Sequence, residues 1–521
     1  MAIPKNLVNL DAMLSRADFA QNQENENSYE TITGISIRDL SRDGMTGKIL
    51  RKPDFQRETS HWTPEQVVSL LECFLNGDLI PSVILWKAPI FLFVIDGGHR
   101  LSVLKAWTED DYGDGPLSVK YFGDAMSENQ LKAAAKTRKL VAESIGTYQH
   151  FKNRIDNSDF NAQTQSIITR TLQLQWVSGD AGKAESSFFK INSQGTALDD
   201  MEEMLLRYRH RPIAIAARAI IRAGKGNKYW SAFPADKAAQ IEELARVLHR
   251  TLFDPEVPSV IKTLELPLGG AKGIRSALQL MIDYLGIAAM KQVGRSIVIA
   301  SIESGENDES GDSTIEVLKK ARKLSDRFTG NEHGSLGLHP AIYFYGPSGV
   351  HSAPLFLGTA KFLNLKILNN DNNFFKQFTS VREQIEKCLV QNKELISTIL
   401  QKVSSRRRTN TYALIISNIF INIKSGKIVS EEDLVDWAGL LGKIVIGGDK
   451  TTSTTFSETT KSKIFINMAL GSAQKCSICG GYLDQTKSAS YDHIIPRREG
   501  GLGSVSNGQI VHPYCNQGYK S

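Results

Sequence analysis

The chain has 521 residues, of which 41% are hydrophobic and 23% are charged. This length allows two or more domains with separate cores, and the composition is that of a globular protein, which excludes a largely disordered or fibrous chain. Lysine and arginine total 62 against 56 acidic residues, a formal net charge of +6. Such a balance is compatible with nucleic acid as a partner, but equally with a plain solvated surface.

The N-terminal sequence shows no long apolar segment of the kind found in export signals. The longest apolar run, LIPSVILWKAPIFLFVI, is interrupted by Pro81, Lys87 and Pro89, so it predicts buried strands and not a membrane span. We therefore expect a cytoplasmic protein without membrane contact. Of the five cysteines, Cys73 and Cys388 stand alone and are expected to be packed thiols, whereas the other three cluster near the C-terminus.

Residues 1–34 are polar and include QNQENENS, which predicts a flexible lead-in. Over residues 35–225 short apolar runs alternate with helical patterns, which predicts an α/β domain. A helix is expected over residues 63–77, TPEQVVSLLECFLNG, where a threonine suits the N-cap, a proline the first turn and a glycine the end. Two strands are expected at 82–86 (SVILW) and 91–95 (FLFVI).

The second of these strands is followed by the sequence DGGHR and by a helix expected to begin near Leu101. Glycines let backbone N–H groups approach a ligand closely, and a helix N-terminus favours an anion. His99 and Arg100 would add charge and hydrogen-bond donors, so the turn is a candidate phosphate or nucleotide pocket. The alternative is an ordinary tight turn in which Asp96 caps the helix.

The rest of the chain before the C-terminus is predicted to be mainly helical. In residues 188–209 (FFKINSQGTALDDMEEMLLRYR) a strand or turn is expected to lead into an amphipathic helix. Residues 226–465 are expected to form a helical middle region. It contains a flexible acidic break at 303–313 (ESGENDESGDS) and a loop or hinge at 449–461 (DKTTSTTFSETTK).

Residues 470–521 contain two close pairs of metal ligands. Cys476 and Cys479 form a C-x-x-C pair, and His512 and Cys515 form an H-x-x-C pair. Four such ligands suit a closed tetrahedral Zn²⁺ site, which is structural because it keeps no open position. A module of about fifty residues buries too little apolar surface to be stable alone, so a metal ion would stabilise it.

Between and beside these pairs lie further polar residues that a zinc site does not need. Asp492 and the side-chain oxygen of Asn516 suit Mg²⁺, and His493 can accept a proton from water near neutral pH. Asn507 could hydrogen-bond to the histidine and orient it. This set suits the attack of water on a phosphodiester, with a metal ion neutralising the leaving oxygen. For any one of these residues the alternative is a solvated turn.

The segments CSIC, YDHIIPRREGG and SNGQIVHPYCNQGYK together resemble the HNH endonuclease module, a ββα-metal nuclease. The family pattern is C-x-x-C, then D-H-I-x-P, a downstream asparagine and finally C-x-x-C-N-x-x-K. The chain departs from it only at His512, which stands at a usual cysteine position. The resemblance implies His493 as general base, Asp492 and Asn516 as ligands of Mg²⁺ or Mn²⁺, and Asn507 as the residue that orients the histidine.

The segments KPDFQRETSHW, IDGGHR and FFKINSQGTALDDMEE resemble the ParB-like DGQHR domain of modification-dependent restriction proteins of the GmrS and SspE type. Gly98 stands where that family has glutamine. The resemblance implies a domain that binds or hydrolyses a nucleotide, with GTP and ATP as candidates, and that senses modified DNA. Its pocket would be lined by Arg57, Asp96, His99, Arg100 and Asn192.

The sequence thus predicts an α+β multidomain protein with a ParB-like α/β domain, a helical middle region and a C-terminal ββα-metal nuclease with structural zinc. We expect a prokaryotic antiviral restriction endonuclease that acts on phage or modified DNA and nicks it under control of the N-terminal domain. Two alternatives are a DNA-binding regulator that keeps the HNH module as a zinc scaffold, and a toxin nuclease acting on RNA or self DNA.

Overall fold

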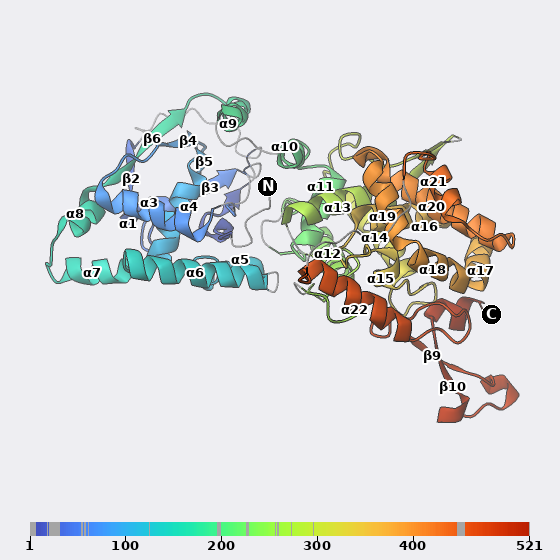
Figure 1. Cartoon of the computed structure of the whole chain (residues 1–521). Coiled ribbons are helices and arrows are strands. Elements are labelled where there is room, and N and C mark those ends of the chain that lie inside the picture. Colours follow the sequence, from blue (N-terminus) through green and yellow to red (C-terminus); the bar gives the residue numbers. More distant parts are fainter. Residues whose placement is uncertain are drawn as a thin grey trace. The chain divides into compact units, whose positions relative to one another are not determined.

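The computed structural model describes residues 7–17, 19, 32–53, 56, 59–60, 62–123, 126–194, 200–225, 229–255, 257, 260–271, 274–294, 296–444 and 454–519 (Figure 1). The chain forms two compact units. The first comprises Met1–Arg209 and Lys225–Tyr229, and the second comprises His210–Gly224 and Trp230–Ser521. The helix Pro212–Ile221, which lies before the predicted boundary at residue 225, belongs to the second unit.

The first unit contains a six-stranded mixed sheet with the strand order β1-β3-β5-β4-β6-β2. Its strands are β1 (Arg16–Ala17), β2 (Gly34–Ser36), β3 (Leu50–Pro53), β4 (Val83–Lys87), β5 (Leu92–Asp96) and β6 (Thr171–Val177). Strand β5 is parallel to β3 and antiparallel to β4, and β4 is parallel to β6. The two strands predicted from SVILW and FLFVI are β4 and β5, so this prediction is confirmed.

Each face of the sheet is covered by a buried hydrophobic cluster. Successive side chains of a strand point to opposite faces, so one strand contributes to both clusters. On β5, Val94 belongs to one buried cluster, and its neighbours Phe93 and Ile95 belong to the other. The central strands are therefore apolar on both sides, as expected for a sheet with helices on each face. The helices of this unit are α1 (Ile37–Leu40), α2 (Thr46–Ile49), α3 (Pro64–Asn76), α4 (Gly98–Glu109), α5 (Pro116–Phe122), α6 (Glu128–Ser144), α7 (Tyr148–Asp156), α8 (Ala162–Thr169), α9 (Ala181–Gln194) and α10 (Asp200–Arg207).

Helix α3 has the ends that its sequence predicts. The Thr63 side chain accepts a hydrogen bond from the backbone N–H of Gln66, and the Gln66 side chain accepts one from the backbone N–H of Thr63. Gly77 ends the helix with φ 83°, a left-handed conformation that glycine adopts without strain. The buried residues Val67, Leu71 and Phe74 then recur at helical spacing along one face.

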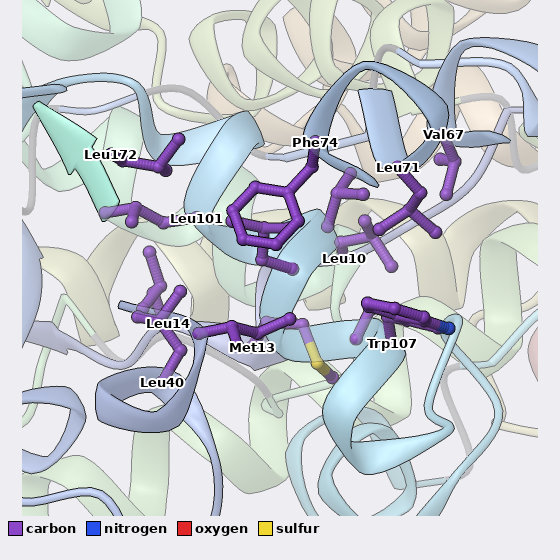
Figure 2. Close-up of a cluster of buried hydrophobic side chains, with 14 of the residues drawn as sticks. Leu10, Met13, Leu14, Leu40, Val67, Leu71, Phe74, Leu101, Trp107 and Leu172 are labelled. Carbon is purple, nitrogen blue, oxygen red and sulfur yellow. The ribbon is translucent and has the colours of Figure 1, made fainter. Parts of the chain in front are cut away.

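Residues 7–17 are not the flexible lead-in that their composition predicts. They form a 3₁₀ turn, Asp11–Met13, and strand β1, which pairs in parallel with β3. Figure 2 shows Leu10, Met13 and Leu14 within the core that α3 and α4 also line. The composition of the first 34 residues is mostly polar, so it did not indicate that these apolar residues belong to the core. Each of the three is about 1% exposed.

The segment 181–194 is helix α9, not the strand or turn that was predicted at its end. Ala181, Ala184 and Phe188 recur at a helical spacing and pack against the sheet, next to Trp86 and Phe93. Phenylalanine by itself has a preference for strands, which led to the prediction of a strand. Burial of Ala181, Ala184 and Phe188 along one face stabilises the helix instead.

The second unit is mostly helical. Its helices are α11 (Pro212–Ile221), α12 (Ala235–Phe253), α13 (Ile274–Ala288), α14 (Asp312–Phe328), α15 (Pro340–Tyr343), α16 (Ala353–Leu368), α17 (Asn372–Ser380), α18 (Arg382–Gln391), α19 (Lys393–Lys402), α20 (Arg408–Lys424), α21 (Glu431–Trp437) and α22 (Glu458–Ser472). This unit also contains the C-terminal cysteine-rich segment, so the predicted middle region and the predicted nuclease module are packed together.

Two local predictions for the middle region are wrong. A two-stranded hairpin, β7 (Lys291–Val293) and β8 (Ser296–Val298), lies within a stretch expected to be helical. In the acidic segment 303–313 the buried Asp308 accepts hydrogen bonds from the backbone N–H groups of Gly311 and Thr314, so this carboxylate organises the start of α14. The segment is therefore a capping loop and not a flexible break.

Among the residues that the structure describes, no helix is long and apolar enough to cross a membrane.

Candidate metal centre and nuclease site

The four predicted metal ligands come together in space. The side chains of Cys476, Cys479, His512 and Cys515 place one ligand atom each within 4.8 Å of all the others, and we call them the Cys3His cluster. Nδ1 of His512 lies 3.4 Å from Sγ of Cys479 and 3.8 Å from Sγ of Cys515. A tetrahedral zinc ion with ordinary Zn–S and Zn–N bonds separates sulfur from nitrogen by about 3.6 Å. The types of the four donors and these two distances therefore fit zinc.

Local backbone geometry brings the two ligand pairs together. The N–H of Gly480 donates to the carbonyl of Cys476, which closes the turn that carries the first two sulfurs. Leu483 and Val511 pack against Cys476 and Cys515 in a small core. Burial lowers the pKa of His512, with the nearby Arg382 as a further cause, and this favours the neutral imidazole that binds a metal ion.

Two of the predicted catalytic residues, Asp492 and His493, lie on an antiparallel ribbon of two strands, β9 (Ser490–His493) and β10 (Gly508–Val511). Asp492 is paired with Gln509 in the register, and Nε2 of Gln509 donates a hydrogen bond of 2.8 Å to Oδ2 of Asp492. His493 is paired with Gly508 at the end of the ribbon, and both Asp492 and His493 are half-buried. Gln509 was not predicted, because only the strand register places it opposite the acid.

Asn516 is brought to the same ribbon from the end of the chain. Asn516 directly follows Cys515 in a short π-helical turn, Cys515–Tyr519. Nδ2 of Asn516 donates to Oγ of Ser490 at 2.8 Å and to the carbonyl of Tyr491 at 3.2 Å. The Asn516 amide is thus fixed to β9 directly before Asp492. Like Gln509, Ser490 is a partner of a predicted site residue that the sequence analysis did not identify.

Asn507 bonds to the backbone that follows the histidine. Its Oδ1 accepts from the N–H of Ile495 at 2.7 Å, and its Nδ2 donates to the carbonyls of Ile495 and Leu502 at 3.2 and 2.9 Å. The N–H of Ile494 also donates to the Asn507 carbonyl. Asn507 therefore fixes the loop directly after His493. An orienting effect on the imidazole would pass through this backbone.

The ribbon and its loop offer an accessible surface. In Figure 1 the β9–β10 ribbon and the loop between its strands extend away from the helices of the same unit. Arg497 and Arg498 are exposed in this loop, close in sequence to His493. Exposed guanidinium groups at this position are available to contact phosphates.

The second candidate site lies at the junction of β5 and α4. Helix α4 begins at Gly98 and not near Leu101, and its N-cap is Gly97, with φ 91°. A Cβ at Gly97 would lie 2.9 Å from Cγ2 of Val83, so both conformation and space require glycine. Asp96 does not cap the helix as the alternative interpretation expected.

Asp96 and Arg100 form an ion pair, with Nη2 of Arg100 2.7 Å from Oδ2 of Asp96. The same nitrogen donates to the carbonyl of Ser82 at 3.0 Å, which fixes the guanidinium at the first turn of α4. His99 stacks on Trp62, with ring centroids 5.5 Å apart and an angle of 20° between the planes. Trp62 ends the segment KPDFQRETSHW, so the two N-terminal motifs meet here.

Gln56 lies beside the position where the family has a glutamine and this chain has Gly98. A Cβ at Gly98 would lie 3.2 Å from Oε1 of Gln56, so the absent side chain leaves room for the Gln56 amide. Oε1 of Gln56 and Nε of Arg100 are buried and have no hydrogen-bond partner among the described residues. Two predicted pocket residues are not placed: Arg57 lies outside the described residues, and of Asn192 only the backbone, in α9, is described.

Comparison with family models gives two matches. Residues 37–209 match the model for the N-terminal domain of the GmrSD restriction endonuclease, and residues 476–521 match the model for HNH endonuclease. Comparison with curated proteins and with solved structures gives no match. The first match ends at residue 209, where the longer segment of the first unit also ends, and the second match contains the whole Cys3His cluster and the ribbon. Residues 37–209 are therefore similar to the N-terminal domain of the GmrSD restriction endonuclease, and residues 476–521 are similar to HNH endonuclease.

Proposed function

We propose that this protein is a restriction-type DNA endonuclease that nicks phage or modified DNA with its C-terminal ribbon. The observation that carries the proposal is that Asp492 and His493 lie side by side in sequence on β9, and that Asn516, the residue after a ligand of the Cys3His cluster, is hydrogen-bonded to the same strand. A scaffold that only bound DNA would not need an acid, a histidine and an amide together at one end of a ribbon.

The two metal sites have different roles. Zn²⁺ in the Cys3His cluster is structural, because its four protein ligands leave no position for water or substrate. Asp492 and the side-chain oxygen of Asn516 would hold Mg²⁺ or Mn²⁺, which are hard ions that prefer oxygen ligands. When bound there, such an ion supplies positive charge to the scissile phosphate and the leaving oxygen.

The residues of the ribbon divide the chemistry among them. His493 accepts a proton from the attacking water, whose oxygen forms a new bond to phosphorus while the bond from phosphorus to the leaving oxygen breaks. Gln509 holds one carboxylate oxygen of Asp492 and so limits the orientations of that ligand. Asn507 fixes the backbone after His493, which keeps the base at the end of the ribbon.

The N-terminal domain would sense the state of the DNA or a bound nucleotide. Support comes from the glycine turn at the start of α4, the Arg100 guanidinium fixed beside it and the stacked pair of His99 and Trp62. A cationic group at a helix N-terminus suits a phosphate, and a flat aromatic ring suits a base. GTP, ATP and modified DNA are the candidate ligands.

The test is a nicking assay on supercoiled plasmid with and without Mg²⁺, using unmodified and modified DNA with and without GTP or ATP. We expect Mg²⁺-dependent nicking that His493→Ala reduces by at least about a hundredfold, since general base catalysis contributes factors of that order. The matched control is His333→Ala, which changes an exposed histidine outside the site.

Equal nicking by zinc-loaded His493→Ala and wild type would refute the assignment of the base. Binding of DNA without any cleavage would favour the non-catalytic regulator. Cleavage of RNA in preference to every DNA would favour the toxin nuclease.

A further inference from the structure

A buried ion pair lies in the helical region directly behind the Cys3His cluster. Nε of Arg382 is 2.7 Å from Oε1 of Glu386, and the two side chains are 1% and 0% exposed. The pair is on α18, almost one hundred residues before the first cysteine ligand. Tyr343 donates its hydroxyl to the same oxygen of Glu386 at 3.0 Å. Arg382 also donates to the backbone carbonyls of Leu336 and Gly337.

This pair is connected to a cluster ligand through one residue. Oε2 of Glu386 accepts a hydrogen bond of 2.6 Å from the backbone N–H of Tyr482. The carbonyl of Tyr482 lies 2.9 Å from Nε2 of His512, whose other ring nitrogen faces the cysteines. A continuous path of hydrogen bonds therefore runs from Arg382 through Glu386 and Tyr482 to the imidazole.

Close backbone contacts leave this arrangement little room to shift. A Cβ at Gly481 would lie 2.6 Å from Nε of Arg382, and a Cβ at Gly337 would lie 2.9 Å from Cδ2 of His512. In addition, the N–H of Tyr514 donates to the carbonyl of Ser335 at 2.9 Å. The Cys3His cluster is thus enclosed by the helical region and not merely attached to it through α22.

We propose that Arg382 and Glu386 are positioning residues of the metal centre, so that the helical region and the HNH module form a single structural unit. The inference rests on the proposed zinc occupancy of the cluster. It assigns the helical region a part in building the nuclease, in addition to any role in coupling it to the N-terminal domain.

The physical basis is the role of outer ligands in metal sites. A hydrogen bond to the second ring nitrogen of a ligating histidine fixes its tautomer and direction, and losing such support typically weakens metal binding by about 10–100-fold. Three thiolates and a neutral imidazole around Zn²⁺ carry one net negative charge, and the guanidinium of Arg382 is a cation that Glu386 holds in this region. Glu386 in turn fixes both Arg382 and the Tyr482 backbone.

The first experiment measures zinc retention in the full-length protein. Glu386→Gln keeps the volume of the side chain but removes its charge, and we expect about 10–100-fold faster transfer of zinc to a colorimetric chelator. The control is Glu383→Gln, the same change three residues earlier, where the carboxylate is 54% exposed and lies 3.4 Å from Lys475. We expect the control to stay within about twofold of wild type, since exposed ion pairs contribute little.

A spectroscopic measurement separates positioning from general stability. In Co²⁺-substituted protein the visible absorption bands report the ligand field of the cluster, and they should change in Glu386→Gln and not in Glu383→Gln. Folded Glu386→Gln with the zinc retention and the Co²⁺ spectrum of wild type would overturn the inference.

A second experiment needs no variant. Hydrogen exchange of the wild-type protein is compared before and after zinc removal by a chelator. We expect protection to be lost both in residues 474–519 and in α15, α18 and residues 330–339, which enclose the cluster. Loss confined to residues after α22 would show an independent module and refute the inference. Neither readout requires cleavage, so a failure to nick DNA would count against the proposed function alone.

Discussion

The buried carboxylate of Asp11 offers a severe test of how the N-terminal segment supports the first unit. Asp11 is 1% exposed, and its Oδ1 lies 2.8 Å from both Nζ of Lys52 and Nη2 of Arg16. It also accepts hydrogen bonds from the backbone N–H of Thr59 and the hydroxyl of Tyr121. Substitution Asp11→Ala would take this one carboxylate away from two buried cations at the same time.

Removing one member of a buried ion pair typically costs about 3–5 kcal/mol of unfolding free energy, because the remaining charge stays desolvated. Lys52 and Arg16 are 0% and 2% exposed, so neither gains much from water when Asp11 is lost. At about 1.4 kcal/mol per tenfold change, we expect the exchange protection of backbone amides in β3, β5 and α4 to fall by roughly a hundredfold to a few thousandfold.

Native-state hydrogen exchange of the full-length protein, read by mass spectrometry, measures this loss. Peptides from α16 and α20 in the second unit serve as an internal reference. The control is Glu65→Ala, which removes an exposed ion pair to Lys136 and should cost less than about 1 kcal/mol. If the exchange protection in Asp11→Ala fell by less than tenfold, or fell only in residues 7–17, the N-terminal segment would not be required for the stability of the first unit.

Three further outcomes are expected. Cys476→Ser should lose most of its zinc by elemental analysis and the exchange protection of β9 and β10, since metal binding and folding are coupled there, and full zinc occupancy would contradict the ligand set. Arg100→Ala should weaken nucleotide binding about tenfold to a hundredfold, because a charge-assisted hydrogen bond contributes about 1.5–3 kcal/mol; a response to GTP, ATP and modified DNA equal to that of wild type would make the β5–α4 junction a structural turn. Burial lowers the pKa of His339 to about 4, below its value of about 6.5 in the unfolded chain. Between these values the unfolded chain binds more protons than the folded chain, so stability rises with pH across this window and is lost as the pH falls through it. His339→Gln should therefore flatten the dependence of the unfolding midpoint on pH in this window, whereas the exposed control His333→Gln should follow wild type, and parallel curves for all three proteins would refute the assignment.

The sequence alone was sufficient to predict those features whose sequence signal lies within a few neighbouring residues. The caps and apolar stripe of α3 predicted its ends, and the compositions of SVILW and FLFVI predicted β4 and β5. The spacing of the C-x-x-C and H-x-x-C pairs likewise predicted a cluster that the structure assembles. Local backbone preferences and ligand spacing are properties of short segments, so no distant contact is needed to recognise them.

Other features depended on which segments meet in the folded chain. Gln509 reaches Asp492 only through the register of the β9–β10 ribbon, and Arg382 reaches the Cys3His cluster only because α18 packs behind it. Asp11 pairs with Lys52, which lies 41 residues later in the sequence. This contact fixes residues 7–17, which were predicted to be a flexible lead-in, to the first unit. Partners of this kind carry no periodic or adjacent signal, because a hydrogen bond or ion pair depends on distance in space and not on separation along the chain. The tertiary structure alone therefore decided how the metal centre is supported and where the first domain begins.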